Sequence, residues 1–174
     1  GLVWTFKIRN DVKFTDGEAL TASDVVFTFN TAKSSQSSLD LTFMDKVEAP
    51  DEETVIFTLK KPTSTFLNTV ATVGIVPEHA YDEDYGIHPI GSGPFKFVQW
   101  NKQEQLILEA NEDYYGTVPA MKKVIIVFQD EDAAFAAVKA GQVDIGLTAA
   151  TLATNEIDGY KVKAITTVDN RGLT

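Results

Sequence analysis

Ser92 is the first residue to consider as a nucleophile, because it stands between two glycines in the sequence Gly-Ser-Gly-Pro at 91–94. A phosphate-binding loop needs Gly-Lys-Ser/Thr, which does not follow here, and Lys96 takes the place of the last glycine of Gly-x-Gly-x-x-Gly. The Gly-x-Ser-x-Gly turn of hydrolases requires glycine where this chain has Ile90. The motif therefore favours a tight backbone turn that depends on glycine and proline.

His79 and His88 are the only histidines, and acidic residues at 82–84 lie between them. Their spacing matches no zinc motif, and nothing pairs either histidine with a serine and an acid as in a catalytic triad. The absence of cysteine excludes disulfides, thiolate metal sites and cysteine nucleophiles. We therefore interpret the histidines as surface residues and predict no enzyme, no metal and no cofactor. A hydrolase that uses Ser92 or an acid pair is the weaker alternative.

Composition narrows the possible partners. The 174 residues include 25 Asp and Glu against 15 Lys and Arg, which gives a net charge of −10. Such a chain repels phosphate backbones, so we predict no nucleic-acid partner. A hydrophobic share of 44% is typical of a globular protein. The length suits either one domain or one domain together with part of a second. No apolar stretch approaches the roughly 20 residues that cross a bilayer.

The first half of the sequence predicts an α+β arrangement. Apolar residues alternate over 2–9, Asp16-Gly17 is typical of a turn, and Thr21 with Asp24 resembles a capping box. The expected elements are a strand at 2–9, a helix at 22–33, a hairpin at 44–49 and 54–60, a short helix at 64–70, and a helical turn at 77–81. In the short helix, Phe66 and Leu67 are expected to be buried, and the many aromatic residues are expected in the core.

The second half predicts a hairpin followed by a βαβ unit. The hairpin strands are expected at 94–100 and 104–110, and the βαβ unit comprises a strand at 124–128, a helix from Asp130 to Ala140 and a parallel strand at 143–147. A short helix near 149–155 and a strand near 160–166 complete the expected elements. We divide the chain into an α+β subdomain, 1–88, and a partial core lobe, 89–174.

Four segments, in this order, resemble the peptide/nickel-type (family 5) solute-binding proteins of ABC transporters. Together they cover nearly the whole chain. They are the strand, Asp-Gly turn and Thr-Ala-x-Asp-Val helix start of 4–29; the strand ending Leu-Lys-Lys-Pro at 59–62 with Phe66-Leu67 after it; Pro-Ile-Gly-Ser-Gly-Pro-Phe at 89–95; and Asn-Glu-Asp-Tyr-Tyr-Gly at 111–116 with Gly-Gln-Val-Asp-Ile at 141–145.

The resemblance implies a mixed α+β and α/β chain, the first lobe of a type II periplasmic-binding-protein-like fold. In that fold two lobes hinge around the ligand, and the second lobe would lie beyond Thr174. The chain enters a strand directly at its first residues, so we expect the natural protein to begin upstream. Since both lobes of such proteins contribute contacts, we expect weak ligand binding by this chain alone. An uncovered lobe interface would allow self-association.

The resemblance also indicates where ligand contact would occur. In the family, the stretch after the Phe-Leu helix approaches the cleft, which here gives Ala71, Thr72, Val73 and Gly74 within the predicted loop 69–74. Nickel-type relatives have an arginine in this stretch, and this chain has none. A small neutral loop suits peptide backbone better than an anionic chelate. A purely structural role for this loop remains the alternative.

The implied function is the substrate-binding component of an ABC importer. Such a protein captures oligopeptides or dipeptides outside the cytoplasm, in the periplasm or at the cell surface, and delivers them to a membrane permease. A signal segment or lipoprotein anchor would lie upstream. The alternatives are another solute, such as a nickel chelate or a sugar, a ligand sensor built on the same scaffold, and a structural interaction domain, because fold alone does not determine function.

Overall fold

The computed structural model describes residues 1–35, 39–148, 151–152 and 157–163. Contacts within the chain define two compact units, Gly1–Ile126 and Val127–Thr174, and each is described by itself. Two three-stranded sheets have the strand orders β1-β3-β2 and β4-β5-β6. In sequence the sheets fall on either side of the predicted boundary at residue 88, whereas the compact units meet after Ile126. The assignment of these parts to a subdomain and a core lobe stays a prediction.

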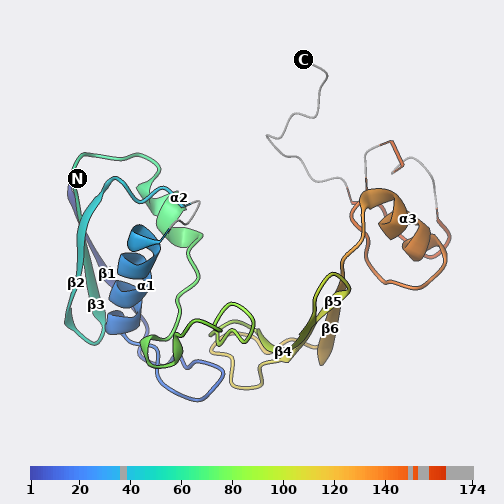
Figure 1. The fold of residues 1–174 in the computed structure, drawn as a ribbon, viewed down its shortest axis with the longest axis horizontal. Helices are drawn as coiled ribbons and strands as arrows, with labels where there is room; N and C mark the ends of the chain where they lie inside the picture. The colour runs from blue at the N-terminus through green and yellow to red at the C-terminus, as the bar shows by residue number, and fades with distance from the viewer. Residues whose placement is uncertain (36–38, 149–150, 153–156, 164–174) are drawn as a thin grey trace. The chain divides into compact units, whose positions relative to one another are not determined.

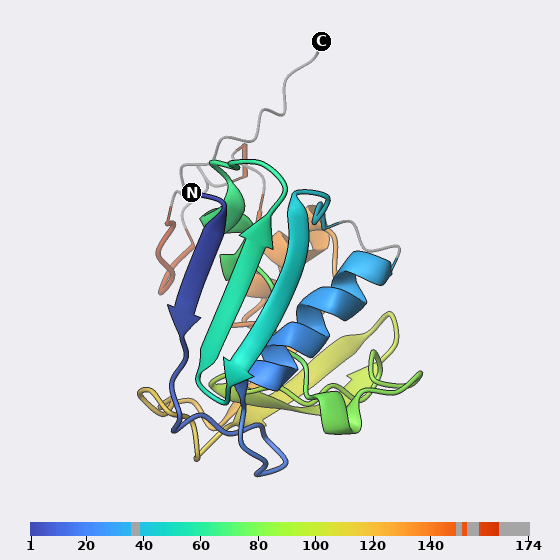
Figure 2. The same cartoon turned by 90° about the vertical axis from the view of Figure 1, so that its left-hand side faces the viewer.

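The first sheet is antiparallel, and its most buried strand lies in the middle. It contains β1 (Val3–Lys7), β2 (Met44–Asp51) and β3 (Thr54–Leu59). On β3, Phe57 lies opposite Trp4 of β1 and opposite Val47 of β2. Figure 2 shows the three strands side by side. The predicted strand and hairpin are confirmed, although Pro50 lies inside β2 and not in the turn.

Helix α1 (Ala22–Ser34) packs along one face of this sheet (Figure 1). Its buried Phe29 meets Phe57 edge to face, with ring centroids 4.8 Å apart. The N–H of Thr21 donates to a carboxylate oxygen of Asp24 over 2.9 Å. This contact satisfies an N–H group at the helix start, as the sequence predicts.

The short helix α2 (Phe66–Ala71) places one aromatic ring at the centre of the core. Phe66 is fully buried, as predicted. Leu67 is 46% exposed, so the prediction that it is buried is wrong. Successive helix residues point about 100° apart, and only the Phe66 side of this six-residue helix faces the core. The predicted helical turn is the 3-10 helix η1 (Glu78–Ala80), which Pro77 precedes.

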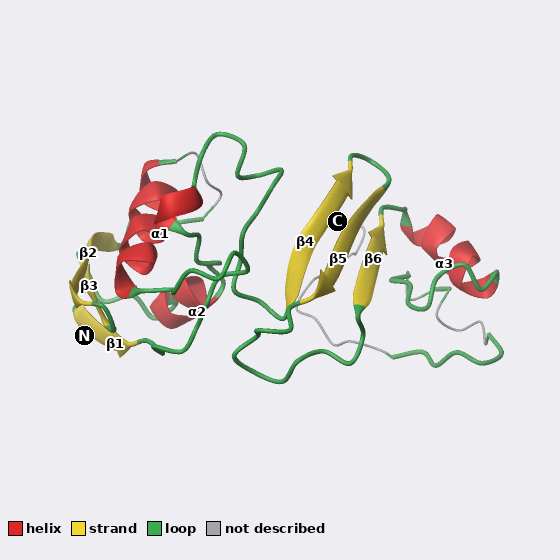
Figure 3. Ribbon diagram, turned by 90° about the horizontal axis from the view of Figure 1, so that it is seen from below, coloured by secondary structure: helices red, strands yellow, loops and turns green. Residues whose placement is uncertain are grey.

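The second sheet begins with the predicted hairpin. Its strands are β4 (Phe95–Asn101), β5 (Gln105–Ala110) and β6 (Lys123–Val127), and Figure 3 shows them side by side. β4 and β5 pair antiparallel from Phe95 opposite Ala110 to Asn101 opposite Gln105. In the turn between them, Gln103 has a positive φ of 66°.

The Gly-Ser-Gly-Pro segment at 91–94 is held through its carbonyl oxygens. The N–H of Thr15 donates to the Gly91 oxygen over 2.8 Å, and the side-chain amide of Asn111 donates to the Gly93 oxygen over 2.9 Å. Loops that cradle phosphate present N–H groups, so these contacts support a structural turn. Contrary to the prediction, the turn does not require glycine at position 93. A Cβ added there would meet nothing nearer than the Phe95 oxygen at 4.0 Å.

The predicted βαβ unit forms only in part. Helix α3 (Glu131–Lys139) begins as expected, with the Asp130 carboxylate accepting from the Ala133 N–H over 2.8 Å. The residues at 143–148 form no strand, and β6 instead has β5 as its neighbour. Gly146 lies against α3, so closely that an added Cβ would be 2.6 Å from Val138 Cγ2. The segment around Gly146 thus contacts α3 and does not form the predicted parallel pairing with the strand before that helix.

Two further predictions concern the end of the chain. The helix near 149–155 and the strand near 160–166 fall largely outside the described residues. Residues 157–160 form a turn in which the Tyr160 N–H donates to the Ile157 oxygen over 3.1 Å. In the parts of the chain that the structure describes, no helix has the length and apolar composition needed to cross a membrane.

Candidate ligand-binding segment

The predicted ligand contact lies at the end of α2, which its first residue fixes in the core. Phe66 packs against four aromatic rings at centroid distances between 5.1 and 6.2 Å. These rings belong to Trp4, Phe6, Phe43 and Phe57. They come from all three strands of the first sheet or the residues next to them, so the sheet determines where α2 lies.

Apolar side chains after Phe66 alternate with exposed positions. Val70, Val73 and Ile75 pack against the core, whereas Ala71, Thr72 and Gly74 are exposed. The predicted loop begins later than expected, because 69–71 form the last turn of α2 and Thr72 caps it. The Thr72 N–H donates back to the Thr69 oxygen over 3.2 Å. We call residues 71–75 the exposed segment.

Beyond the exposed segment, α1 holds the chain through two side chains. The N–H of Val76 donates to the Thr28 hydroxyl over 3.0 Å, and the N–H of Glu78 donates to Asp24 Oδ1 over 3.0 Å. Both Thr28 and Asp24 are buried. The segment is therefore held at one end by α2 and at the other by α1. The sequence predicts Asp24 as a helix cap, but its second contact, 54 residues away, had no sequence signal.

The exposed segment offers backbone groups and no charge. In the part of the chain that the structure describes, the N–H and C=O groups of Gly74 and Ile75 have no hydrogen-bond partner in the protein. The whole stretch 69–77 contains no ionisable side chain. Backbone donors and acceptors at an exposed, anchored position can pair with the main chain of an extended peptide.

Two hollows in the described residues lie away from the exposed segment. One, of about 420 Å³, is lined by Gly1, Trp4, Pro62, Thr63, Ser64 and Leu67. The other, of about 260 Å³, is lined by Ile87, His88, Phe97, Val98, Gln99, Trp100 and Lys102. Neither of these two hollows is lined by Ala71, Thr72, Val73 or Gly74.

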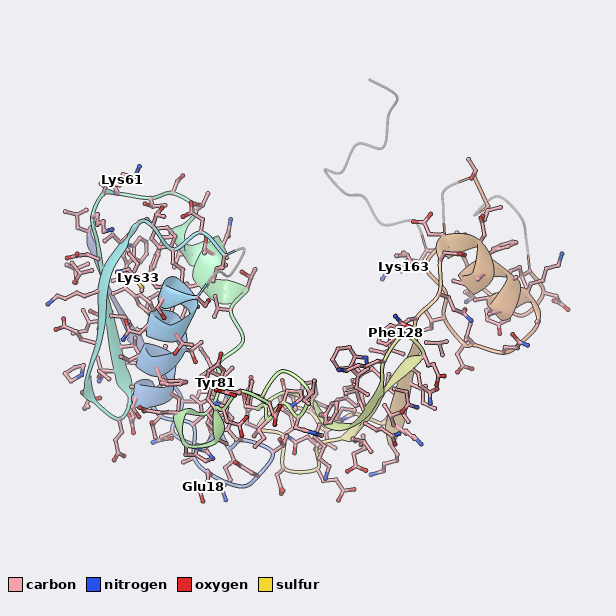
Figure 4. The ribbon with its side chains drawn as sticks, in the orientation of Figure 1. Glu18, Lys33, Lys61, Tyr81, Phe128 and Lys163 are labelled. Carbon is pink, nitrogen blue, oxygen red and sulfur yellow. The ribbon has the colours of Figure 1, made fainter. Side chains whose placement is uncertain are left out.

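The two histidines lie in separate surroundings. His79 Nε2 is 2.7 Å from Asp16 Oδ2, whereas the ring of His88 meets that of Phe97. Tyr81, which is labelled in Figure 4, follows η1. Its ring packs on that of Phe27 of α1. Among the described residues no three histidine or acidic side chains gather as metal ligands would.

The contact between His79 and Asp16 should make stability depend on pH. The hydrogen bond to Asp16, with the nearby charges of Glu18 and Asp24, raises the pKa of His79 above its usual value. The stabilisation is therefore complete below the unfolded-state pKa of about 6.5 and is lost as pH rises through the folded pKa. The difference in melting temperature between the native chain and His79→Gln should shrink between pH 5.5 and 8.5. An equal difference at both pH values would contradict this.

Comparison with known proteins decides the family. The model of the bacterial extracellular solute-binding proteins, family 5 Middle, matches residues 1–173. The chain belongs to this family. Its sequence is 35% identical over 160 residues to the oligopeptide-binding protein AppA of Bacillus subtilis, a match that covers 83% of this chain and 30% of AppA. The chain therefore spans about 30% of the length of this relative.

Solved structures show the same family fold. The chain resembles NikZ from Campylobacter jejuni, solved in complex with Ni(L-His), with a TM-score of 0.77 and 32% identity over 83% of this chain and 31% of NikZ. It resembles AppA from Bacillus subtilis in complex with a nonapeptide, with a TM-score of 0.72 and 35% identity over 82% of this chain and 32% of AppA. The expected part of a type II periplasmic-binding-protein-like fold is thus confirmed.

Proposed function

We propose that this chain is the part of an ABC-importer binding protein that contributes the exposed segment to a peptide site. Family membership supports solute binding, and the similarity to AppA supports oligopeptides as the solute. The observation that carries the proposal is the free backbone of Gly74 and Ile75 in an anchored, uncharged stretch. Ala71, Thr72 and Val73 precede these groups and shape their surroundings. The protein acts by binding and release and catalyses nothing.

A peptide fits this stretch better than a metal chelate. Carboxylate-rich ligands are best held by guanidinium groups, and 69–77 contains no arginine or lysine. Main-chain hydrogen bonds also allow a peptide to be held whatever its side chains are. The nickel complex of NikZ keeps a chelate as the second candidate. A sensor built on the same scaffold would use the same contact.

The proposed site is open on one side. Ala71, Thr72 and Gly74 are exposed to solvent, and ligands of clam-shell proteins bury most of their surface between two lobes. We therefore expect the chain to bind peptides in the millimolar range. In the proposed role, the protein delivers its ligand to a membrane permease. It acts outside the cytoplasm, and a lipid anchor is one means by which it would be attached to the membrane.

An NMR titration tests the contact directly. Adding a tripeptide to the ¹⁵N-labelled chain should shift the amide signals of 71–75 progressively, with the largest changes at Gly74 and Ile75. Gly74→Pro removes the donor together with its own amide signal, and it should reduce the shifts of the remaining amides in 71–75 about fivefold or more, which corresponds to the loss of about one hydrogen bond. Gly74→Ala keeps the donor and has open space for its methyl group, so it should bind like the native chain.

Two results would overturn the proposal. One is the absence of peptide-dependent shifts at 71–75 while the amide spectrum shows a folded chain. The other is an equal response in Gly74→Pro and Gly74→Ala, which would mean that the backbone donor does not take part. A response to Ni(L-His) and none to the tripeptide would favour the chelate instead.

A further inference from the structure

The Gly-Ser-Gly-Pro turn at 91–94 lies between the two sheets of the unit Gly1–Ile126. Every residue of the main core cluster comes from the stretch between Trp4 and Ile75, around the first sheet. The strands β4 and β5 pair in the second sheet, which shares no strand with the first. The chain passes once from one sheet to the other, between η1 and β4. A change in the arrangement of the two sheets would therefore be absorbed by the backbone of this connection.

The turn is held at its two ends by different parts of the chain. The N–H of Thr15, in the loop between β1 and α1, donates to the Gly91 oxygen over 2.8 Å. The side-chain amide of Asn111, which follows β5, donates to the Gly93 oxygen over 2.9 Å. Between them, the N–H and C=O of Ser92 have no hydrogen-bond partner in the described part of the chain. The backbone around Ser92 thus joins one carbonyl held beside the first sheet to another held beside the second.

The conformation seen here does not require glycine at either position. Neither Gly91 nor Gly93 has a positive φ. A Cβ added to Gly91 would meet nothing within 4 Å, and one added to Gly93 would meet only the Phe95 oxygen at 4.0 Å. The wider range of φ that glycine allows is therefore unused in this arrangement and becomes useful in a second one. Pro94 fixes its own φ, so the variable stretch ends before β4.

A stacking contact crosses the same junction. Cζ of Arg9, two residues after β1, lies 5.1 Å from the ring centroid of Tyr115. Asp11 accepts two hydrogen bonds from this guanidinium, over 2.8 and 2.6 Å, and so fixes its plane. Tyr115 belongs to the loop after β5, which begins with Asn111. An exposed contact between a cation and an aromatic ring is weak, so it can favour one arrangement without preventing another.

We propose that residues 91–93 form a hinge between the first and the second sheet, and that the stacking of Arg9 on Tyr115 is a latch that favours the arrangement seen here. In the second arrangement the backbone around Ser92 turns and Arg9 leaves Tyr115, whereas Thr15 and Asn111 keep their carbonyl partners. The exposed segment moves with the first sheet, because its apolar side chains pack in that core. The proposal goes beyond peptide binding and does not depend on it.

Double electron–electron resonance measures the hinge, since the chain contains no cysteine that would compete for spin labels. Labels at Lys60→Cys and Glu109→Cys report the distance between exposed positions after β3 and in β5. The otherwise native chain should give two distances. Gly91→Ala combined with Gly93→Ala should give one, because alanine fits the present turn but disfavours the left-handed region of φ.

Two matched controls separate the hinge and its latch from other effects. Gly74 also has open space for a Cβ but lies in the exposed segment, so Gly74→Ala should keep both distances. Arg9→Gln should raise the share of the second distance about two- to fivefold, the value of an exposed stacking contact. Lys102→Gln removes a cation 5.8 Å from the Trp100 ring centroid within the second sheet, so it should leave the shares unchanged.

Four results would overturn the proposal. The first is one narrow distance in both the native chain and Arg9→Gln. The second is an equal response of Gly74→Ala and the double alanine variant, which would place the motion elsewhere. The third is unfolding of the double alanine variant in circular dichroism, which would mean that the present turn itself needs glycine. The fourth, an equal effect of Arg9→Gln and Lys102→Gln, would exclude the latch.

Discussion

Replacing Phe66 with alanine should reduce the free energy of unfolding by about 3–5 kcal/mol, the cost of deleting a large aromatic side chain from a packed core. Phe66 is fully buried and touches four other rings. The loss should appear as a lower midpoint in urea denaturation. The exposed segment should also lose its fixed position, because Phe66 anchors the helix that leads to it.

Leu67 provides the control in the same helix. It is 46% exposed, so Leu67→Ala should change stability by no more than about 0.5 kcal/mol. Alanine has a higher helix propensity than either residue, and the gain is larger for phenylalanine than for leucine, so helix propensity cannot explain a greater loss of stability in Phe66→Ala. Similar effects of the two variants would mean that Phe66 does not occupy the centre of the core.

Replacing Asp24 with alanine should reduce the free energy of unfolding by about 2–4 kcal/mol, because it removes a helix cap and leaves three part-buried donors without their acceptor. Its carboxylate accepts from the Thr21 N–H, the Thr21 hydroxyl and the Glu78 N–H at 2.9 to 3.0 Å. Hydrogen exchange at the Glu78 amide should become faster than the loss of global stability explains.

Thr28→Val distinguishes the two contacts of α1. It removes the hydroxyl that binds Val76 but leaves Asp24 in place, so it should cost about 1 kcal/mol and leave the Glu78 amide protected. Unchanged exchange at Glu78 in Asp24→Ala would contradict the role of Asp24 in holding the chain beyond the exposed segment.

The sequence predicts well those elements whose partners are close along the chain. The capping pair Thr21 and Asp24, the helix after it and both hairpins follow local rules that the structure confirms. Most aromatic residues of the first half pack in the core, as their spacing predicts, whereas Phe27 is half-buried and packs on Tyr81 outside the core cluster. The parallel pairing at 143–147 was wrong because an apolar strand indicates burial but does not identify its neighbour.

The candidate site could be predicted only in part. The segment 71–74 was located by resemblance, and the structure shows Ala71, Thr72 and Gly74 exposed and Val73 half-buried. The buried anchors Asp24 and Thr28 act across about 50 residues of sequence, so no local pattern indicates them. The open backbone at Gly74 depends on the path of the chain between these anchors. Such contacts appear only once the fold is known.

Calorimetric titration of the chain with dipeptides and oligopeptides is the most direct test of the proposed peptide site. We predict heat changes that do not saturate below millimolar peptide, because in the proposed site this chain supplies one side and its Gly74 and Ile75 backbone offers few contacts. Saturable binding at micromolar peptide by these 174 residues would contradict it. That result would show that the chain encloses a ligand without a second lobe.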